Sequence, residues 1–206
     1  MMQSQARLEA ISDGIFAFAA TLVVVSLDVP DSYAELRASF ADVGSFAVSF
    51  IALVMLWVTH YNFFRRTTII DGWIIAYNFG MLFVMLCYIF PLKFLAKLTF
   101  GGATINNHME MMELFQLYGL GFSLVFLFVA LLYRRAAKKE LASAAYLHYW
   151  KRHFLIFFGI GILSILLATF SIGMRFGVPG MIYSLLGPLC YWHGKSTGVD
   201  PPSVEA

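Results

Sequence analysis

The sequence predicts an all-α integral membrane protein, with six transmembrane helices in a single domain that covers residues 1–206. Of its 206 residues, 60% are apolar and 13% are charged, whereas soluble domains are about 45–50% apolar and about 25% charged. Six long apolar runs follow one another, and the segments between them are too short to fold alone. This composition excludes a soluble enzyme, a nucleic-acid-binding protein and a large extramembrane domain.

Each apolar run is judged by its length. A helix rises about 1.5 Å per residue, so about 20 residues cross about 30 Å of hydrocarbon. Five runs meet this length, and the sixth is shorter and rich in glycine and proline, so we expect it to be kinked or tilted. The runs are continuously apolar rather than alternating, which favours helices over a β-barrel. The predicted spans are residues 11–29, 45–64, 73–92, 112–133, 154–173 and 176–193.

Positive charges predict the orientation. With six spans, both termini and the loops 65–72 and 134–153 share one side of the membrane. That side carries ten of the 14 lysine and arginine residues, so the positive-inside rule places both termini in the cytoplasm. Asp13 interrupts the start of the first run, which we therefore interpret as a retained helix rather than a cleaved signal peptide.

Polar residues gather at the predicted cytoplasmic ends of the first three helices. Ionisable groups at the edge of a span are costly unless they are paired. Arg7 and Asp13 lie on different faces of one helix, so we expect their partners on other helices. Trp57 and His60 share a face of the second span, and Asn78 interrupts the third. Together with Ser12, these residues predict one buried polar network that joins three helices.

The segment Arg7-Leu8-Glu9-Ala10-Ile11-Ser12-Asp13-Gly14 resembles a known signature. The pattern Arg-x-x-x-Phe-Ser-Asp-Gly opens the first helix of the lysosomal and endosomal potassium-channel family and its prokaryotic relatives, and here Ile11 stands in place of the phenylalanine. Trp57-x-x-His60, Asn78 and the Phe90-Pro91 pair that closes the third helix are also similar. The resemblance covers roughly residues 7–92.

This resemblance implies a function and an assembly. The chain carries one copy of the motif, like the prokaryotic members, so the resemblance implies a homotetrameric, potassium-permeable channel in the cell membrane of a prokaryote. The pore would be lined by the first helix and would lack a Thr-Val-Gly-Tyr-Gly filter. Potassium is then the permeant ion, and no cofactor, other metal or nucleic acid is expected. In the family, the signature residues, including Gly14, hold the first three helices together.

One face of the first helix carries Phe18, Thr21, Leu22 and Val25. The family offsets place the narrow hydrophobic position on Phe18 and the pore-facing threonine on Thr21. We therefore expect Phe18, Leu22 and Val25 to form a hydrophobic gate, because a narrow apolar ring excludes water. Thr21 would contribute to selectivity. Asp28, in an acidic loop after this helix, would attract cations to an external vestibule.

The sequence leaves one alternative class of protein and disfavours another. A small secondary transporter is the alternative, although such proteins usually show paired broken helices and charged residues near the middle of the membrane. An intramembrane enzyme is disfavoured, because the sequence has neither a Gly-x-Ser-x-Gly motif nor a set of metal ligands on facing helices.

Overall fold

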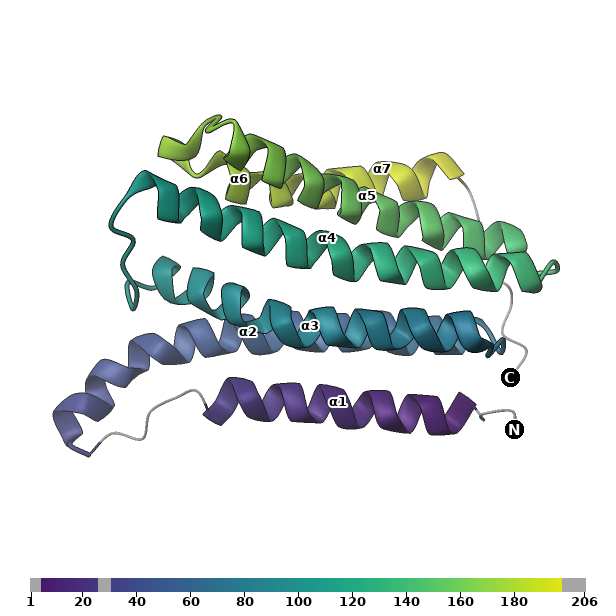
Figure 1. The fold of residues 1–206 in the computed structure, drawn as a ribbon, viewed down its shortest axis with the longest axis horizontal. Helices are drawn as coiled ribbons and strands as arrows, with labels where there is room; N and C mark the ends of the chain where they lie inside the picture. The colour runs from purple at the N-terminus through teal and green to yellow at the C-terminus, as the bar shows by residue number, and fades with distance from the viewer. Residues whose placement is uncertain (1–4, 26–30, 198–206) are drawn as a thin grey trace.

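The computed structural model describes residues 5–25 and 31–197, except the side chains of residues 36, 38–42 and 197. These residues form an all-helical bundle (Figure 1). The long helices are α1 (Gln5–Val25), α2 (Tyr33–Arg66), α3 (Gly72–Thr99), α4 (His108–Lys139) and α5 (Ala144–Thr169). Four short elements follow: η1 (Met174–Phe176), α6 (Val178–Met181), η2 (Ile182–Leu185) and α7 (Leu186–Thr197).

Five of the six predicted spans correspond to helices that are long and apolar enough to cross a membrane, α1 to α5. The sixth, residues 176–193, is not one long helix. Gly177 has a φ of 66°, in the left-handed region that suits glycine, and Pro179 is the second residue of the four-residue helix α6. The all-helical membrane fold is therefore confirmed, and a sixth crossing stays a prediction.

The helices extend beyond the apolar runs, so the predicted loop 134–153 was wrong in part. Residues 134–139 complete α4 and residues 144–153 begin α5, which leaves a short connection between the two helices. Lysine and arginine are good helix formers and suit the last turn of a helix, where Lys138 and Lys139 stand. Hydropathy identifies only the residues that suit a lipid environment, whereas a helix can continue beyond the end of its apolar run.

Pro91 does not close the third helix, contrary to the prediction. It lies inside α3, which continues to Thr99 and leans to a new direction in its last turns (Figure 1). Proline cannot donate the helical hydrogen bond and its ring crowds the preceding turn, which bends the helix. Membrane helices tolerate such a break where neighbouring groups satisfy the freed carbonyl.

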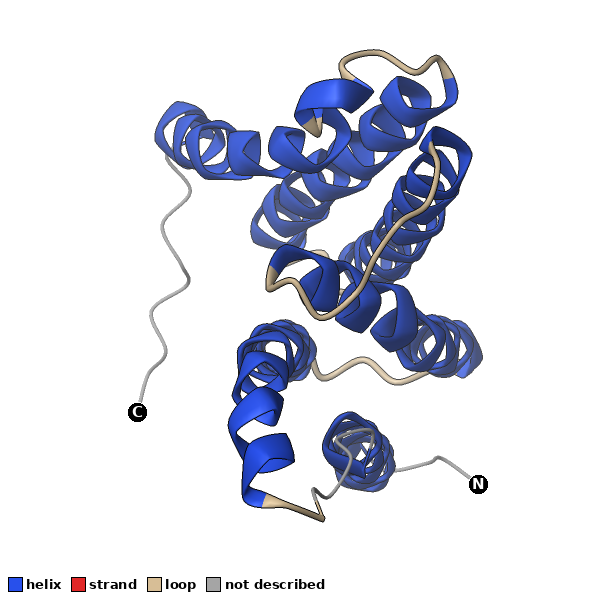
Figure 2. Ribbon diagram, turned by 90° about the vertical axis from the view of Figure 1, so that its left-hand side faces the viewer, coloured by secondary structure: helices blue, strands red, loops and turns tan. Residues whose placement is uncertain are grey.

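The bundle has two unequal parts. The helices α4 and α5 make the most extensive contact and run side by side, and α3 packs on α4 (Figure 1). The helix α1 lies at the opposite edge and packs mainly on α2 and α3 (Figure 2). The start of α1, the end of α7 and the α2–α3 and α4–α5 connections all lie toward the same end of the bundle (Figure 1). Side chains such as Phe63, Leu82 and Tyr133 form the core between these parts.

Asp71 ties the beginning of α3 to the end of α4. Its carboxylate caps α3 by accepting from the backbone amides of Trp73 and Ile74, at 3.1 and 3.0 Å. It also accepts from Nε of Arg135 at 2.7 Å. Burial alone would raise the pKa of Asp71, but these hydrogen bonds outweigh it and hold the pKa below its usual value.

We expect Gly161→Ala to weaken the packing of α4 on α5. A methyl group there would collide with Oγ of Ser123 and come within 3.2 Å of the carbonyl oxygen of Gly119. Overpacking of this kind costs about 1–3 kcal/mol, so thermal unfolding of the purified protein should occur at a lower temperature. Gly159→Ala is the matched control, because nothing lies within 4 Å of its added methyl group. Equal unfolding temperatures for the two variants would contradict this packing.

Asp71→Asn should remove a pH-dependent part of the stability. Asparagine caps helices about as well as aspartate, so the variant isolates the loss of charge beside Arg135. Because the folded-state pKa of Asp71 is lowered, its contribution is present above the unfolded-state value of about 3.9 and is lost as pH falls through the folded-state value. The difference in unfolding temperature between wild type and variant should therefore be largest near neutral pH and shrink in acid. A difference that does not change with pH would contradict the ion pair.

Candidate functional site

A chain of buried hydrogen bonds joins α1, α2 and α3. Nε2 of His60 donates to Oδ1 of Asn78 at 2.8 Å, since that oxygen can only accept. Nδ2 of Asn78 donates to Oγ of Ser12 at 2.9 Å, and this hydroxyl donates to the carbonyl of Leu8 at 2.8 Å. All three polar side chains are buried. The predicted meeting of Ser12, His60 and Asn78 is therefore present in the structure.

Aromatic rings flank this chain. The imidazole of His60 lies between Phe16 of α1 and Phe64 of its own helix, with ring centroids 5.5 and 4.8 Å away. Phe16 is itself buried. The rings keep water away from the hydrogen bonds, which are stronger in such low-dielectric surroundings. Breaking one of them would leave a buried polar group without a partner.

Asp13 and Trp57 form a second, separate contact. Nε1 of Trp57 donates to Oδ1 of Asp13 at 2.8 Å. This pair lies at the surface, so the predicted single network is in fact a buried chain and an exposed pair. Both connect α1 to its neighbours. The hydrogen bonds and ion pairs among the described residues do not include Arg7, which is exposed, and nothing lies within 4 Å of a methyl group placed on Gly14.

A third connection was missed by the sequence reasoning. Nε2 of Gln5 donates to the backbone carbonyl of Phe64 at 2.8 Å and to Oε1 of Glu9 at 2.7 Å. Gln5 lies seven residues before Ser12, on the same face of α1. That spacing was the available signal. It was overlooked because Gln5 precedes the signature motif.

The two faces of α1 differ sharply. One face is buried against α2 and α3 through Leu8, Ser12, Phe16, Ala19 and Val23. The opposite face exposes Ile11, Phe18 and Val25, which recur every seven residues and are 50%, 57% and 72% exposed. Thr21 is also exposed, and its hydroxyl donates to the carbonyl of Ala17 at 3.0 Å.

The predicted pore face is brought together only in part. Phe18, Thr21 and Val25 lie on the open side of α1. Leu22 is half-buried and lines a pocket with Ile89 and Phe90 of α3, so it is turned toward a neighbouring helix. Asp28, predicted at an external vestibule, lies outside the described residues. Within the part of the chain that the structure describes, histidine, cysteine and acidic side chains form no group of three or more that could hold a metal ion.

The sequence comparisons agree with the predicted resemblance. Residues 7–91 match the family described as endosomal/lysosomal potassium channel TMEM175. A potassium channel of Marivirga tractuosa is 37% identical over 152 residues, which cover 67% of this chain and 62% of that protein. A potassium channel of Streptomyces collinus is 29% identical over 102 residues, or 47% of this chain and 50% of that protein. The chain thus spans less than two thirds of the length of these relatives, which are named as channels and not as enzymes.

Two solved structures share the fold. A crystal structure of a variant of the potassium channel MtTMEM175, bound to a nanobody fusion protein, matches with a TM-score of 0.80 and 28% identity, over 96% of this chain and 94% of that one. A homologue of the lysosomal potassium-selective channel TMEM175 from Chamaesiphon minutus matches with a TM-score of 0.63 and 19% identity, over 95% and 98% of the two chains. The predicted resemblance to the TMEM175 family is therefore confirmed.

Asn78→Leu should release α1 from the bundle. Leucine has a similar size but offers no hydrogen bond, so His60 is left without its partner and Ser12 loses a donor. Each buried unsatisfied polar group costs about 1–3 kcal/mol, so the yield of folded protein and its unfolding temperature should both fall. Asn62→Leu is the control, because no hydrogen bond of the Asn62 side chain is found among the described residues and it lies on α2. Similar losses in both variants would show that the hydrogen-bond chain has no special role.

Proposed function

We propose that this chain, whose first half resembles the TMEM175 channels, is a potassium-permeable cation channel of a prokaryotic cell membrane. In this proposal the chain crosses the membrane six times with both termini in the cytoplasm, and four copies assemble around their α1 helices. The names of the relatives in Marivirga tractuosa and Streptomyces collinus support the ion. The similar fold of MtTMEM175 supports the architecture.

The observation that carries the proposal is the open apolar face of α1. One side of this helix is fixed to α2 and α3, and the other presents Phe18, Thr21 and Val25 away from the bundle. From residue 14 to residue 25, α1 contains no charged side chain. Four such helices around one axis would form an apolar path with a single ring of hydroxyl groups.

Two sets of side chains along this path would block the flow of ions and discriminate between cations. Rings of Phe18 and Val25 would block ions by their bulk and by expelling water, with Leu22 between them. The Thr21 hydroxyl uses its proton in the bond to Ala17, so its oxygen keeps a lone pair for another partner. Four such oxygens would replace water molecules around a cation. In this proposal Phe18, Leu22 and Val25 form the gate, and Thr21 contributes to selectivity.

The polar contacts would act as the scaffold of the pore. Ser12, His60 and Asn78 keep one face of α1 against the bundle, and the Asp13–Trp57 pair adds a second attachment. The functions proposed for Arg7 and Gly14 in holding the first helices, and for Asp28 at the external mouth, rest on the resemblance alone. A small secondary transporter remains the alternative, and it would move potassium only when coupled to another gradient.

Potassium flux in liposomes tests the channel and its gate. Purified protein should conduct potassium in preference to sodium without a proton gradient, and Phe18→Ala should raise the basal flux several-fold by widening the hydrophobic ring. Phe83→Ala, at a position on α3 that is also exposed, is the control and should leave the flux unchanged. Flux that requires a coupled proton gradient would favour the transporter, and an unchanged flux in Phe18→Ala would remove that residue from the gate.

Thr21→Ala should lower the preference for potassium over sodium in the same liposomes, because the ring of oxygens is lost. Thr59→Ala is closely matched, since the Thr59 hydroxyl on α2 is also exposed and donates to the carbonyl four residues earlier, at 2.9 Å. The control should keep the wild-type ratio of potassium to sodium flux. A shift of that ratio in both variants, or in neither, would contradict the role of Thr21.

A further inference from the structure

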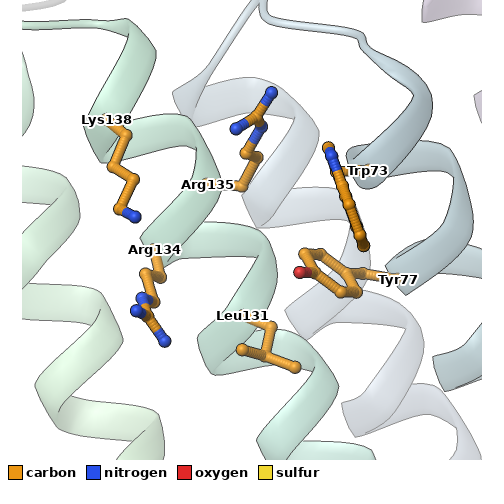
Figure 3. A pocket seen from close by; sticks show the side chains of 6 residues that line it. All are labelled: Trp73, Tyr77, Leu131, Arg134, Arg135 and Lys138. Atoms are coloured by element: carbon orange, nitrogen blue, oxygen red, sulfur yellow. The ribbon is translucent and has the colours of Figure 1, made fainter.

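A basic pocket of about 180 Å³ lies between the beginning of α3 and the end of α4 (Figure 3). Arg134 and Lys138 extend from one side of α4, and Arg135 lies on the side nearer to Trp73 and Tyr77 of α3 (Figure 3). Leu131 forms an apolar part of the wall. The pocket takes no part in the hydrogen-bond chain or in the open face of α1.

The positive charge of this pocket is only partly balanced. Asp71 neutralises Arg135 through the ion pair described above. Glu140, which follows the last residue of α4, accepts from the backbone amide and the hydroxyl of Thr68, at 3.0 and 3.1 Å. Among the described residues, neither Arg134 nor Lys138 has an acidic partner within ion-pair distance. These two cations are four residues apart on one helix face, where like charges repel.

The aromatic wall places this pocket at a membrane surface. Trp73 and Tyr77 occupy the first two turns of a helix that is long and apolar enough to span the bilayer, and their rings lie 5.8 Å apart. Trp73 is 58% exposed. Tryptophan and tyrosine concentrate at the level of lipid headgroups. The lysine and arginine residues at the end of α4 therefore face the layer in which lipid phosphates lie.

We infer that this pocket binds the phosphate group of an anionic lipid. The guanidinium of Arg134 and the ammonium of Lys138 would hold the phosphate oxygens, and the acyl chains would lie along Leu131 and the aromatic rings. The lipid would connect α3 to α4 beside the Asp71–Arg135 pair. It would also relieve the repulsion between the two cations. This binding is independent of ion conduction.

Native mass spectrometry of the purified full chain tests the inference, with phosphatidylglycerol and phosphatidylcholine as probes. Wild type should retain phosphatidylglycerol in preference to phosphatidylcholine. The double variant Arg134→Gln/Lys138→Gln should weaken that binding by about tenfold or more, since each cation near an anionic headgroup contributes about fivefold. Lys138→Arg should keep it. Lys151→Gln/Arg152→Gln removes the same charge from α5 outside the pocket and should change binding less than about twofold.

The experiment distinguishes lipid binding in the pocket from general electrostatic attraction between the lipid and a positively charged protein. All three variants should elute as wild type does in size-exclusion chromatography, because the substituted side chains are not in the core. Equal weakening in the two double variants, or no preference for phosphatidylglycerol in wild type, would overturn the pocket. Inorganic phosphate at millimolar concentration should not displace the lipid. Displacement by inorganic phosphate would overturn the assignment to a lipid and identify a site for free phosphate.

Discussion

The hydrogen-bond chain from His60 through Asn78 to Ser12 is the constraint on which the arrangement of α1 depends. The apolar side chains of a membrane helix pack against protein and lipid almost equally well, so they do not fix its rotation. Buried polar groups do, because each must meet a partner. Rotation of α1 by one residue, about 100°, would remove Ser12 from Asn78. The identity of the open face follows from this chain, and the Asp13–Trp57 and Gln5–Phe64 hydrogen bonds support the same orientation.

The other half of the bundle is held together differently. Gly119 on α4 and Gly161 on α5 allow the two backbones to approach, and the residues opposite leave no room for a methyl group. Close packing of small residues is the usual basis of helix association in lipid. Stacked aromatic rings, such as those of Phe126 and Phe154, fill the remainder of this interface. Thus α5 is held by close packing of its side chains and backbone against α4, whereas α1 is held by hydrogen bonds at defined positions.

The sequence was sufficient for the residues whose chemistry allowed few alternatives. Polar groups in apolar runs had to meet, so Ser12, His60 and Asn78 could be assigned to one network, although Asp13 and Trp57 pair separately. The ends of the helices could not be predicted, because hydropathy falls where lipid ends and helices continue into water. Leu22 shares a calculated face with Phe18, yet neighbouring α3 covers it in part. The basic pocket was also missed, since residues 134–153 were expected to form a loop and Trp73 was not connected to them.

The length of α4 sets the depth of its charged end. Its 32 residues extend about 48 Å, and the apolar run 112–133 accounts for about 33 Å of that, close to the thickness of the hydrocarbon. The length of the apolar run of α4 therefore determines where its charged end lies relative to the bilayer. Arg134 is the first residue past the apolar run and Lys138 is one turn further, so a rigid rod, rather than a loop, fixes their height above the acyl chains.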